Sequence, residues 1–379
     1  MFHLMFSTPC LYVIARFIYP LPWPLAARLA AALLLLLASQ YHLYAKFSSG
    51  SVFSPEFPRA WVLFFNWAFG AIVLLAVLQL VVDLGTVLTM LVRRQWLTIP
   101  PLVRYGIGTV AVLLAALGVH QAARVPPLKD ITVAIRDLPP AFEGYTLLQL
   151  TDMHISRLFD APWTREVVRR SNALGVDVVL ITGDLIDGPI DARRNDIEPL
   201  RDLRAPDGVY VIPGNHEYFF DNEGWMRYFV SLGMKRLSNS HAVIARGDAQ
   251  LVVAGVTDLS APRAGLPGPD LAQALAGVPA KAPIILLDHQ PRNARQAARQ
   301  GVALQLSGHT HGGMIRILDR IIAGANEGFV SGFYQVGDMQ LYVNNGTALW
   351  PGFALRLGVP SELTRITLRR ANPVAPTDT

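Results

Sequence analysis

The sequence predicts two parts, an α-helical region that crosses a membrane and an α/β domain that follows it. Of the 379 residues, 52% are hydrophobic and 16% are charged, whereas an ordinary soluble domain carries about 25% charged residues. The long apolar stretches all precede Arg124, and beyond it short runs of β-forming residues alternate with helical stretches. We therefore assign residues 1–123 to a transmembrane region and residues 124–379 to an α/β domain large enough to bury its own core.

The transmembrane region contains three stretches without charged side chains. A helix needs about 20 mostly apolar residues to cross the hydrocarbon core of a bilayer, and residues 29–45, 61–82 and 105–123 come close to this requirement. Residues 4–19 are also apolar, but Arg16 interrupts them and Pro20 follows them. They form either a short fourth span or an interfacial segment, and we favour a span.

Basic residues in the short loops predict how the chain is oriented, because Lys and Arg are retained on the cytoplasmic side. Five basic residues share one face of the membrane and three lie on the other. The first set is Arg16, Arg28, Arg93, Arg94 and Arg104, and the second is Lys46, Arg59 and Arg124. This imbalance predicts that the α/β domain lies outside the cytoplasm.

Composition limits the chemistry that the α/β domain can use. The single cysteine, Cys10, lies in the apolar region, so the domain has neither a disulfide framework nor a thiolate metal site. Any metal there must be bound by His, Asp, Asn or Glu. The net charge is +5, but no block of Lys and Arg stands out, so we expect no nucleic-acid partner. Residues 371–379 are expected to form a polar tail.

Metal-ligand residue types follow five of the predicted strands. These strands are expected at residues 145–150, 176–181, 209–212, 284–287 and 302–306, with a sixth at 251–256. The blocks that follow the five are Asp152-Met153-His154, Gly183-Asp184 with Asp187 nearby, Gly214-Asn215-His216-Glu217, His289, and Gly308-His309-Thr310-His311-Gly312-Gly313. Because loops beyond strand ends form the functional crevice of an α/β sheet, these side chains are expected to converge.

The histidines of the α/β domain support this interpretation. Five of its six histidines fall in these blocks, and only His241 does not. An isolated histidine is more often a structural residue than a ligand, but five at strand ends favour a metal site. Imidazole nitrogens mixed with carboxylate and amide oxygens suit Mn, Fe or Zn better than Ca.

The order of the blocks resembles the calcineurin-like metallophosphoesterase family, whose signature runs D-x-H, G-D, G-N-H-[DE], a single H, and G-H-x-H. All five blocks occur in that order, within about residues 147–313. The spellings G-N-H-E and G-H-T-H-G-G look closest to membrane-anchored bacterial members, which implies a bacterial-type inner or plasma membrane. The resemblance implies a β-sandwich flanked by helices, a four-layer αββα fold, after the helical membrane segment.

The resemblance also implies a role for each of these residues. One metal would be held by Asp152, His154, Asp184 and His311, and a second by Asp184, Asn215, His289 and His309. Asp184 would thus bridge two divalent ions, of which Mn is expected to support activity in vitro, and a hydroxide activated by both ions would attack phosphorus. In catalysis, alongside Asp184, His216 would be the proton donor or an electrostatic stabiliser, with Glu217 as the partner that orients it. Asp187 would orient a loop or a ligand, or would be structural.

These inferences predict an enzyme integral to the membrane that hydrolyses phosphoesters, as a phosphodiesterase or a phosphomonoesterase. A lipid or cell-envelope phosphoester is one expected substrate, because a tethered site samples substrate in two dimensions. The other is a soluble phosphoester, with the spans serving only to localise the enzyme. The alternative is a membrane transporter or sensor whose extramembrane domain binds metal without turnover. Transport requires ionisable residues within the spans, and the sequence offers Arg16, His42 and Asp83 near their edges. No protein partner can be inferred.

Overall fold

The computed structural model describes residues 2–371, with side chains from residue 7 onward. The chain forms two compact units. A helical unit contains the described residues up to Arg124 together with Trp350–Leu357, and an α/β unit contains Val125–Leu349 and the residues from Gly358. Of the tail expected at residues 371–379, all but Ala371 lies outside the described residues.

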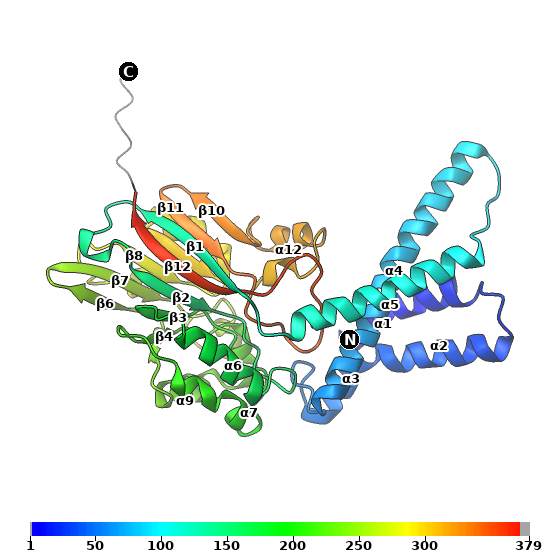
Figure 1. Cartoon of the computed structure of the whole chain (residues 1–379), viewed down its shortest axis with the longest axis horizontal. Coiled ribbons are helices and arrows are strands. Elements are labelled where there is room, and N and C mark those ends of the chain that lie inside the picture. Colours follow the sequence, from blue (N-terminus) through cyan, green and yellow to red (C-terminus); the bar gives the residue numbers. More distant parts are fainter. Residues whose placement is uncertain (1, 372–379) are drawn as a thin grey trace, which may run out of the picture. The chain divides into compact units, whose positions relative to one another are not determined.

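The helical unit consists of five α-helices and one short π-helix within the described residues (Figure 1). Their bounds are α1 Phe2–Val13, the π-helix Ile14–Ile18, α2 Leu25–Ser39, α3 Tyr41–Ser49, α4 Arg59–Arg93 and α5 Pro101–Ala123. By length and composition α4 and α5 can each cross a membrane, and α2 with α3 can form a third, bent span. The expected spans at residues 61–82 and 105–123 lie inside α4 and α5.

The first two apolar stretches form a short helix and a bent helix pair within the described residues. Residues 29–45 are not one continuous helix, because α2 and α3 meet at Gln40 with a bend of 44°. Polar side chains concentrate at this break: Gln40 Nε2 donates to Ser39 Oγ at 3.0 Å, and Ser39 Oγ donates to the carbonyl of Leu36 at 2.8 Å. Residues 4–19 form α1 and the π-helix, with Pro9 inside α1, and the apolar helix of Ser7–Ile18 is shorter than the other candidate spans.

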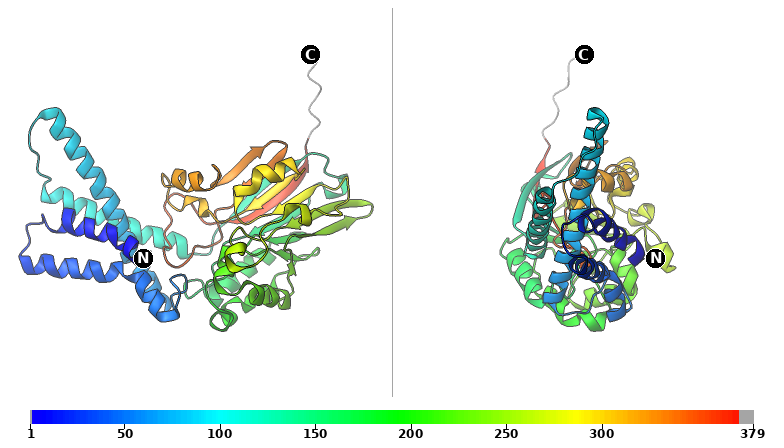
Figure 2. Two further views of the ribbon diagram at one scale, coloured as in Figure 1. Left: turned by 180° about the vertical axis from the view of Figure 1, so that it is seen from behind. Right: turned by 90° about the vertical axis from the view of Figure 1, so that its right-hand side faces the viewer.

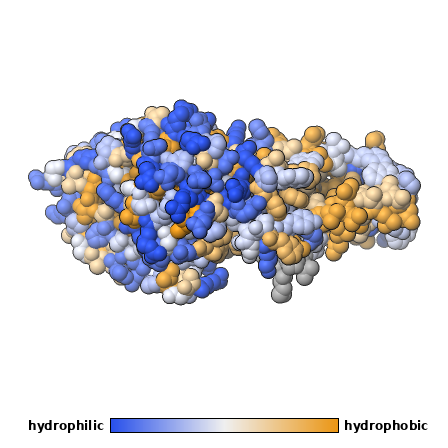
Figure 3. Space-filling model, turned by 90° about the horizontal axis from the view of Figure 1, so that it is seen from below, coloured by the Kyte–Doolittle hydropathy of each residue, from blue (hydrophilic) through white to orange (hydrophobic). Residues whose placement is uncertain are grey.

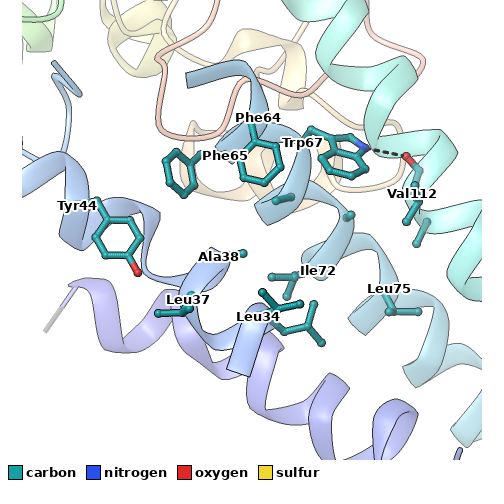
Figure 4. A pocket seen from close by; sticks show the side chains of 14 residues that line it. Leu34, Leu37, Ala38, Tyr44, Phe64, Phe65, Trp67, Ile72, Leu75 and Val112 are labelled. Carbon is teal, nitrogen blue, oxygen red and sulfur yellow. Dashed lines mark hydrogen bonds between the residues drawn. The ribbon is translucent and has the colours of Figure 1, made fainter. Parts of the chain in front are cut away.

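The helical unit exposes apolar side chains of the kind that lipid covers. Val81, Leu84, Leu88 and Leu91 on α4 are each more than half exposed, and apolar residues gather over this unit in Figure 3. An apolar groove of about 570 Å³ also lies among α2, α4 and α5. Leucines, Phe64, Phe65 and Trp67 line it, and Trp67 Nε1 donates to the carbonyl of Val112 at 3.2 Å (Figure 4).

A segment distant in sequence completes the helical unit. Trp350–Leu357 packs among these helices through buried hydrogen bonds to Asn66 on α4. Asn66 Nδ2 donates to the carbonyl of Pro351 at 2.8 Å, and Asn66 Oδ1 accepts from the backbone N–H of Ala354 at 2.6 Å. Tyr41 Oη donates to the same Pro351 carbonyl at 2.8 Å. One buried amide therefore satisfies backbone groups that would otherwise lack partners.

The α/β unit contains two six-stranded sheets. The first has the order β1-β12-β2-β3-β4-β5 and the second the order β10-β11-β9-β8-β7-β6. The strands are β1 Leu128–Ile135, β2 Thr146–Leu150, β3 Val178–Ile181, β4 Val209–Val211, β5 Lys235–Arg236, β6 Ser240–Arg246, β7 Ala249–Gly255, β8 Ile284–Leu287, β9 Leu304–Ser307, β10 Gly332–Val336, β11 Met339–Val343 and β12 Leu363–Arg370. β2, β3, β4 and β5 are parallel, as are β7, β8, β9 and β11.

The core lies between the two sheets, which pack face to face. Leu147 and Val178 of the first sheet belong to one buried cluster with Val253, Ile285 and Leu304 of the second. Helices α6 Ala161–Asn172, α7 Ile190–Ile197, α8 Asn215–Phe220 and α9 Asn222–Ser231 follow strands of the first sheet, and α10 Leu271–Ala274, α11 Ala294–Arg299 and α12 Asp319–Ala325 fall within the second half of the unit. Figures 1 and 2 show α6, α7 and α9 on one side of the sandwich, while α10 and α11 join a second cluster on the outer face of the other sheet. This is the expected four-layer αββα arrangement.

Replacing Asn66 with alanine is expected to destabilise the folded chain by about 1–3 kcal/mol, because the buried N–H of Ala354 would lose its acceptor. The thermal unfolding midpoint of the full chain in detergent measures this effect. Thr89→Ala, at an exposed position of the same helix, is the control and should change the midpoint little. An unchanged midpoint in Asn66→Ala would contradict this account of the segment.

Candidate metal centre

The carboxyl ends of five strands bring the predicted residues together. β2 leads to Asp152 and His154, β3 to Asp184, β4 to Asn215 at the start of α8, β8 to His289, and β9 to His309 and His311. Parallel strands end at the same edge of a sheet, so the loops that follow them can meet there. Because the ends of β2, β3 and β4 face those of β8 and β9 across the sandwich, both sheets supply side chains to one buried cluster.

The first group contains Asp152, His154 and His311, with His311 Nε2 3.3 Å from His154 Nε2 and 3.7 Å from Asp152 Oδ1. His154 Nε2 also lies 3.8 Å from Asp184 Oδ2. Metal-ligand bonds of about 2.1 Å separate neighbouring ligand atoms by about 3.0–3.5 Å. The three side chains could therefore close around one ion with small adjustments.

The second group contains Asp184, His289 and His309, and Asn215 lies among them. Asn215 Oδ1 is 2.8 Å from His309 Nδ1 and 3.1 Å from His289 Nε2. His289 Nε2 is 3.3 Å from Asp184 Oδ2, and its other ring nitrogen donates to the carbonyl of Thr182 at 2.7 Å. That hydrogen bond fixes the ring so that Nε2 is directed at the cluster.

Asp184 joins the two groups. Its Oδ2 faces His154 of one group and His289 of the other, while Oδ1 accepts from the backbone N–H of His216 at 2.8 Å. Burial alone would raise the pKa of this carboxyl, but His289, His216 and His154 outweigh burial and hold the pKa well below its usual range. Asp184 is thus a buried anion that depends on the positive charge around it.

The other histidines of the cluster respond to the same charges. Burial lowers the pKa of His289, but Asp184 reverses this effect and raises the pKa well above its usual value. Burial and the neighbouring His289 lower the pKa of His309 to about 3, so the His309 ring is neutral at physiological pH. A neutral imidazole is the form that binds a metal ion.

His216 stands at the edge of the cluster and is held by Asp187. Its Nδ1 makes a short contact with Asp187 Oδ1, and the other oxygen of Asp187 lies 3.1 Å from His154 Nδ1. Its Nε2 is directed toward Asp184 Oδ2, 3.9 Å away. Burial opposes the charged ring, but Asp184 and Asp187 outweigh it and raise the pKa of His216 to about 9. Asp187 therefore orients two of the predicted residues at once.

Glu217 organises the backbone around Asp184 and Asn215. Its Oε2 accepts from the backbone N–H groups of Gly214 at 2.7 Å and Asp184 at 3.0 Å, and its Oε1 accepts from Leu185 at 2.7 Å. The sequence favoured Glu217 as the partner that orients His216. In the structure Asp187, and not Glu217, contacts Nδ1 of His216. Glu217 instead accepts hydrogen bonds from the backbone.

Backbone conformations mark the cluster as strained. Asp152, His154, Asp184, His309 and His311 all have φ between 43° and 68°. This left-handed region is uncommon for residues other than glycine and persists only where the surroundings enforce it. Five of the predicted ligands therefore adopt costly conformations that turn their side chains toward one another.

Two glycines allow the loops to approach closely. A Cβ atom at Gly214 would overlap Asp184 Oδ1, and one at Gly308 would overlap Asp152 Oδ2. At Gly214 and Gly308 the absence of a side chain therefore leaves space beside a predicted ligand. His241 stays outside the cluster, where its Nδ1 lies 2.8 Å from the carbonyl of Ala274.

Two residues that contact the histidines of the cluster were not identified from the sequence. Thr182 orients His289 through its carbonyl oxygen, a backbone role that leaves no side-chain signal. Phe219 on α8 places its ring centroid 5.0 Å from that of His216 and is 46% exposed. Phe219 follows His216 by three residues in the sequence. That spacing did not identify it as part of the site, because an aromatic residue in a helix more often belongs to a core.

Comparison with known proteins shows the family to which this chain is related. The calcineurin-like phosphoesterase family matches residues 145–313. A transmembrane protein with a metallophosphoesterase domain from Danio rerio is 36% identical over 271 residues, covering 69% of this chain and 62% of the relative. Its Bos taurus counterpart is 35% identical, with 69% and 61% covered. An uncharacterised metallophosphoesterase of Bacillus subtilis is 30% identical over 291 residues, covering 74% of this chain and 98% of the relative.

The chain belongs to the calcineurin-like phosphoesterase family. The family and the clustered His and Asp side chains together support binding of divalent metal ions. The matches span about three fifths of the length of the two vertebrate relatives. These relatives also correct the expectation of a bacterial type, because the same combination of domain and membrane segment is named in fish and cattle.

Replacing Gly214 with alanine is expected to reduce metal content more than it reduces stability, because the added methyl group would displace Asp184 and leave the core intact. Metal analysis of the purified chain, with its thermal unfolding midpoint, measures both effects. Gly324→Ala, where an added Cβ has open space, is the matched control. A Gly214→Ala protein with full metal content would contradict the close-approach argument.

Proposed function

We propose that the chain hydrolyses phosphoesters at a membrane surface with two divalent ions. The observation that carries the proposal is the buried carboxylate of Asp184, which faces a ligand-type nitrogen of each group, His154 Nε2 at 3.8 Å and His289 Nε2 at 3.3 Å. A carboxylate shared by two such groups suits a pair of neighbouring cations, because it screens their repulsion. Family membership supports the same reaction class.

We keep the ligand assignment that the family resemblance implies, and the clustering of these side chains supports it. Asp152, His154, Asp184 and His311 would hold one ion, and Asp184, Asn215, His289 and His309 the other. Mixed nitrogen and oxygen donors without thiolate suit Mn, Fe or Zn. When bound, two such ions lower the pKa of water and neutralise charge that develops on phosphoryl oxygens.

The protein's own groups would handle the proton and the geometry. Protonated His216 would donate its Nε2 proton to the departing alkoxide, because Nδ1 is already engaged by Asp187. Asp187 would keep the ring charged and correctly turned, and Glu217 would hold the backbone of Asp184. Bound cations would lower the raised pKa of His216 toward neutrality, where an acid is most effective.

Apolar helices in the same chain support a phosphoester of a lipid or of the cell envelope as the substrate. We further infer a multi-pass arrangement in an inner or plasma membrane, with the α/β unit on the face opposite Arg93, Arg94 and Arg104. A phosphomonoester has one substituted phosphate oxygen and a phosphodiester has two, and the proposal covers both.

The alternative of a transporter would draw on ionisable residues among the helices. Arg16 and Asp83 form such a pair, with Arg16 Nε 2.9 Å from Asp83 Oδ2. Tyr12 donates to the same carboxylate at 2.7 Å and Gln79 at 2.8 Å. Because three donors satisfy Asp83, we assign this pair to helix packing.

Asp184→Asn and His289→Ala are each expected to lower hydrolysis of a soluble aryl phosphodiester by roughly 10²-fold or more, because each removes a predicted ligand. Purified full-length chain with Mn, assayed for turnover and metal content, tests this. His241→Ala, outside the cluster, is the control and should retain activity. Full activity in His289→Ala would refute the metal assignment.

His216→Ala is expected to slow hydrolysis of a phosphoester with an alkyl leaving group by about 10²–10⁴-fold. A substrate that releases p-nitrophenolate should lose much less, because that anion needs no proton. Because the acid must be protonated, wild-type activity on the alkyl substrate should fall as pH rises through the pKa of His216. This alkaline decline should be absent in His216→Ala, and equal losses on both substrates would exclude a proton-donor role.

A further inference from the structure

The α/β unit exposes a cluster of aliphatic side chains just after the last predicted ligand. Ile317 is 81% exposed, Ile321 71% and Leu318 37%. The other large hydrophobic side chains exposed on the described part of this unit, such as Val230 and Val243, are separated in sequence. Single exposed apolar residues are ordinary, whereas contiguous patches mark interaction sites. We call residues 316–322 the aliphatic loop.

The backbone presents these side chains at a cost. Ile317 has φ of 93°, a conformation that a β-branched residue adopts only under constraint. Asp319 Oδ1 supplies that constraint, because it accepts from the backbone N–H groups of Ile317 at 3.2 Å and Arg320 at 2.9 Å. A strained loop held with its isoleucines in solvent indicates a function beyond folding.

Two arginines give the aliphatic loop positive charge. Arg316 and Arg320 are both exposed, and neither belongs to an ion pair recorded among the described residues. Asp319, the acid between them, directs an oxygen at the backbone. Among the described residues, Arg316 Nη2 donates only to the carbonyl of Gly358, at 3.5 Å. Aliphatic side chains flanked by cations outside ion pairs match the interfacial region of a bilayer that contains anionic phospholipids. A protein interface surrounds its apolar centre with a polar rim of matched hydrogen-bond partners, whereas the exposed charged side chains of this loop are both arginines.

The loop is tied closely to the metal centre. The backbone N–H of Met314 donates to the carbonyl of His311 at 3.2 Å, and α12, labelled in Figure 1, starts at Asp319. A Cβ atom at Gly313 would lie 2.5 Å from Asp319 Cα, so the start of α12 packs directly against the glycine pair after His311. Anything that binds the aliphatic loop is therefore held within a few residues of a predicted ligand.

We propose that the aliphatic loop docks on the surface of the bilayer, where Ile317, Leu318 and Ile321 enter the interface and Arg316 and Arg320 contact lipid phosphates. The same chain contains helices long and apolar enough to cross a membrane, and these would tether the α/β unit to a bilayer. Docking brings the metal centre to the headgroup level and selects phospholipid phosphoesters as substrates. The choice of substrate rests on the proposed hydrolase function, whereas docking itself does not.

Fluorescence quenching in proteoliposomes tests docking directly. The full chain carrying Cys10→Ser and Ile321→Cys is labelled with an environment-sensitive fluorophore and reconstituted in phosphatidylcholine with phosphatidylglycerol and nitroxide-labelled lipid. Val230→Cys, which is half exposed on α9, provides the matched control. We expect a blue shift and strong quenching at residue 321 and little of either at residue 230.

Two outcomes of that experiment would overturn the proposal. Equal quenching at residues 321 and 230 would show that lipid does not single out the loop. A blue-shifted label at residue 321 that nitroxide lipid does not quench would show that protein covers the loop, from the chain's own helical unit or from a second copy.

The substrate inference has a separate test in the ratio of two rates. Hydrolysis of a phospholipid phosphoester in vesicles is compared with hydrolysis of a soluble aryl phosphodiester, for the wild type and for Ile321→Asp. We expect this ratio to fall by about tenfold, because a charged side chain opposes insertion. An unchanged ratio would refute selection of lipid by the loop. Inactivity of the wild type on both substrates would refute the hydrolase function and leave the quenching result standing.

Discussion

The structure depends on burying a carboxylate between two groups of imidazoles. Asp184 is 2% exposed, and Asp152 and Asp187 are buried beside it, so three carboxylates share a small volume from which water is largely excluded. Burying an anion without compensation is among the most costly events in folding. His154, His216 and His289 supply part of the compensation, as the low pKa of Asp184 and the raised pKa of His289 show. Divalent cations would supply the rest.

The fold supplies the constraint that holds such a cluster together. Two parallel arrays of buried strands end at the same edge, and their loops are held by backbone hydrogen bonds to Glu217 and by the absence of side chains at Gly214 and Gly308. Left-handed conformations at five predicted ligands store strain that these contacts must offset. The closely packed core of the sandwich makes this arrangement possible. Its interlocking aliphatic side chains fix the positions of the strand ends independently of the loops.

Much of the centre could be predicted from the sequence because buried parallel strands leave continuous apolar runs, and ligand types directly follow them. The strands β2, β3, β4, β8 and β9 gave both signals, and β7 gave the apolar run alone. The remaining six did not: β1 alternates exposed and buried residues, and β5 has two residues. Contacts between residues distant in sequence could not be predicted either. Nothing local shows that Trp350–Leu357 packs with Asn66, that Ser39 and Gln40 break an apolar helix, or that Asp187 contacts two histidines 62 residues apart (from 154 to 216).

The most direct test of this account is an anomalous-diffraction measurement on crystals of the Mn-loaded chain. Two peaks about 3.5–4 Å apart, with Asp184 between them and Asn215 beside only one, would agree with the shared-carboxylate centre. A single peak, or peaks that do not contact Asp184, would contradict it.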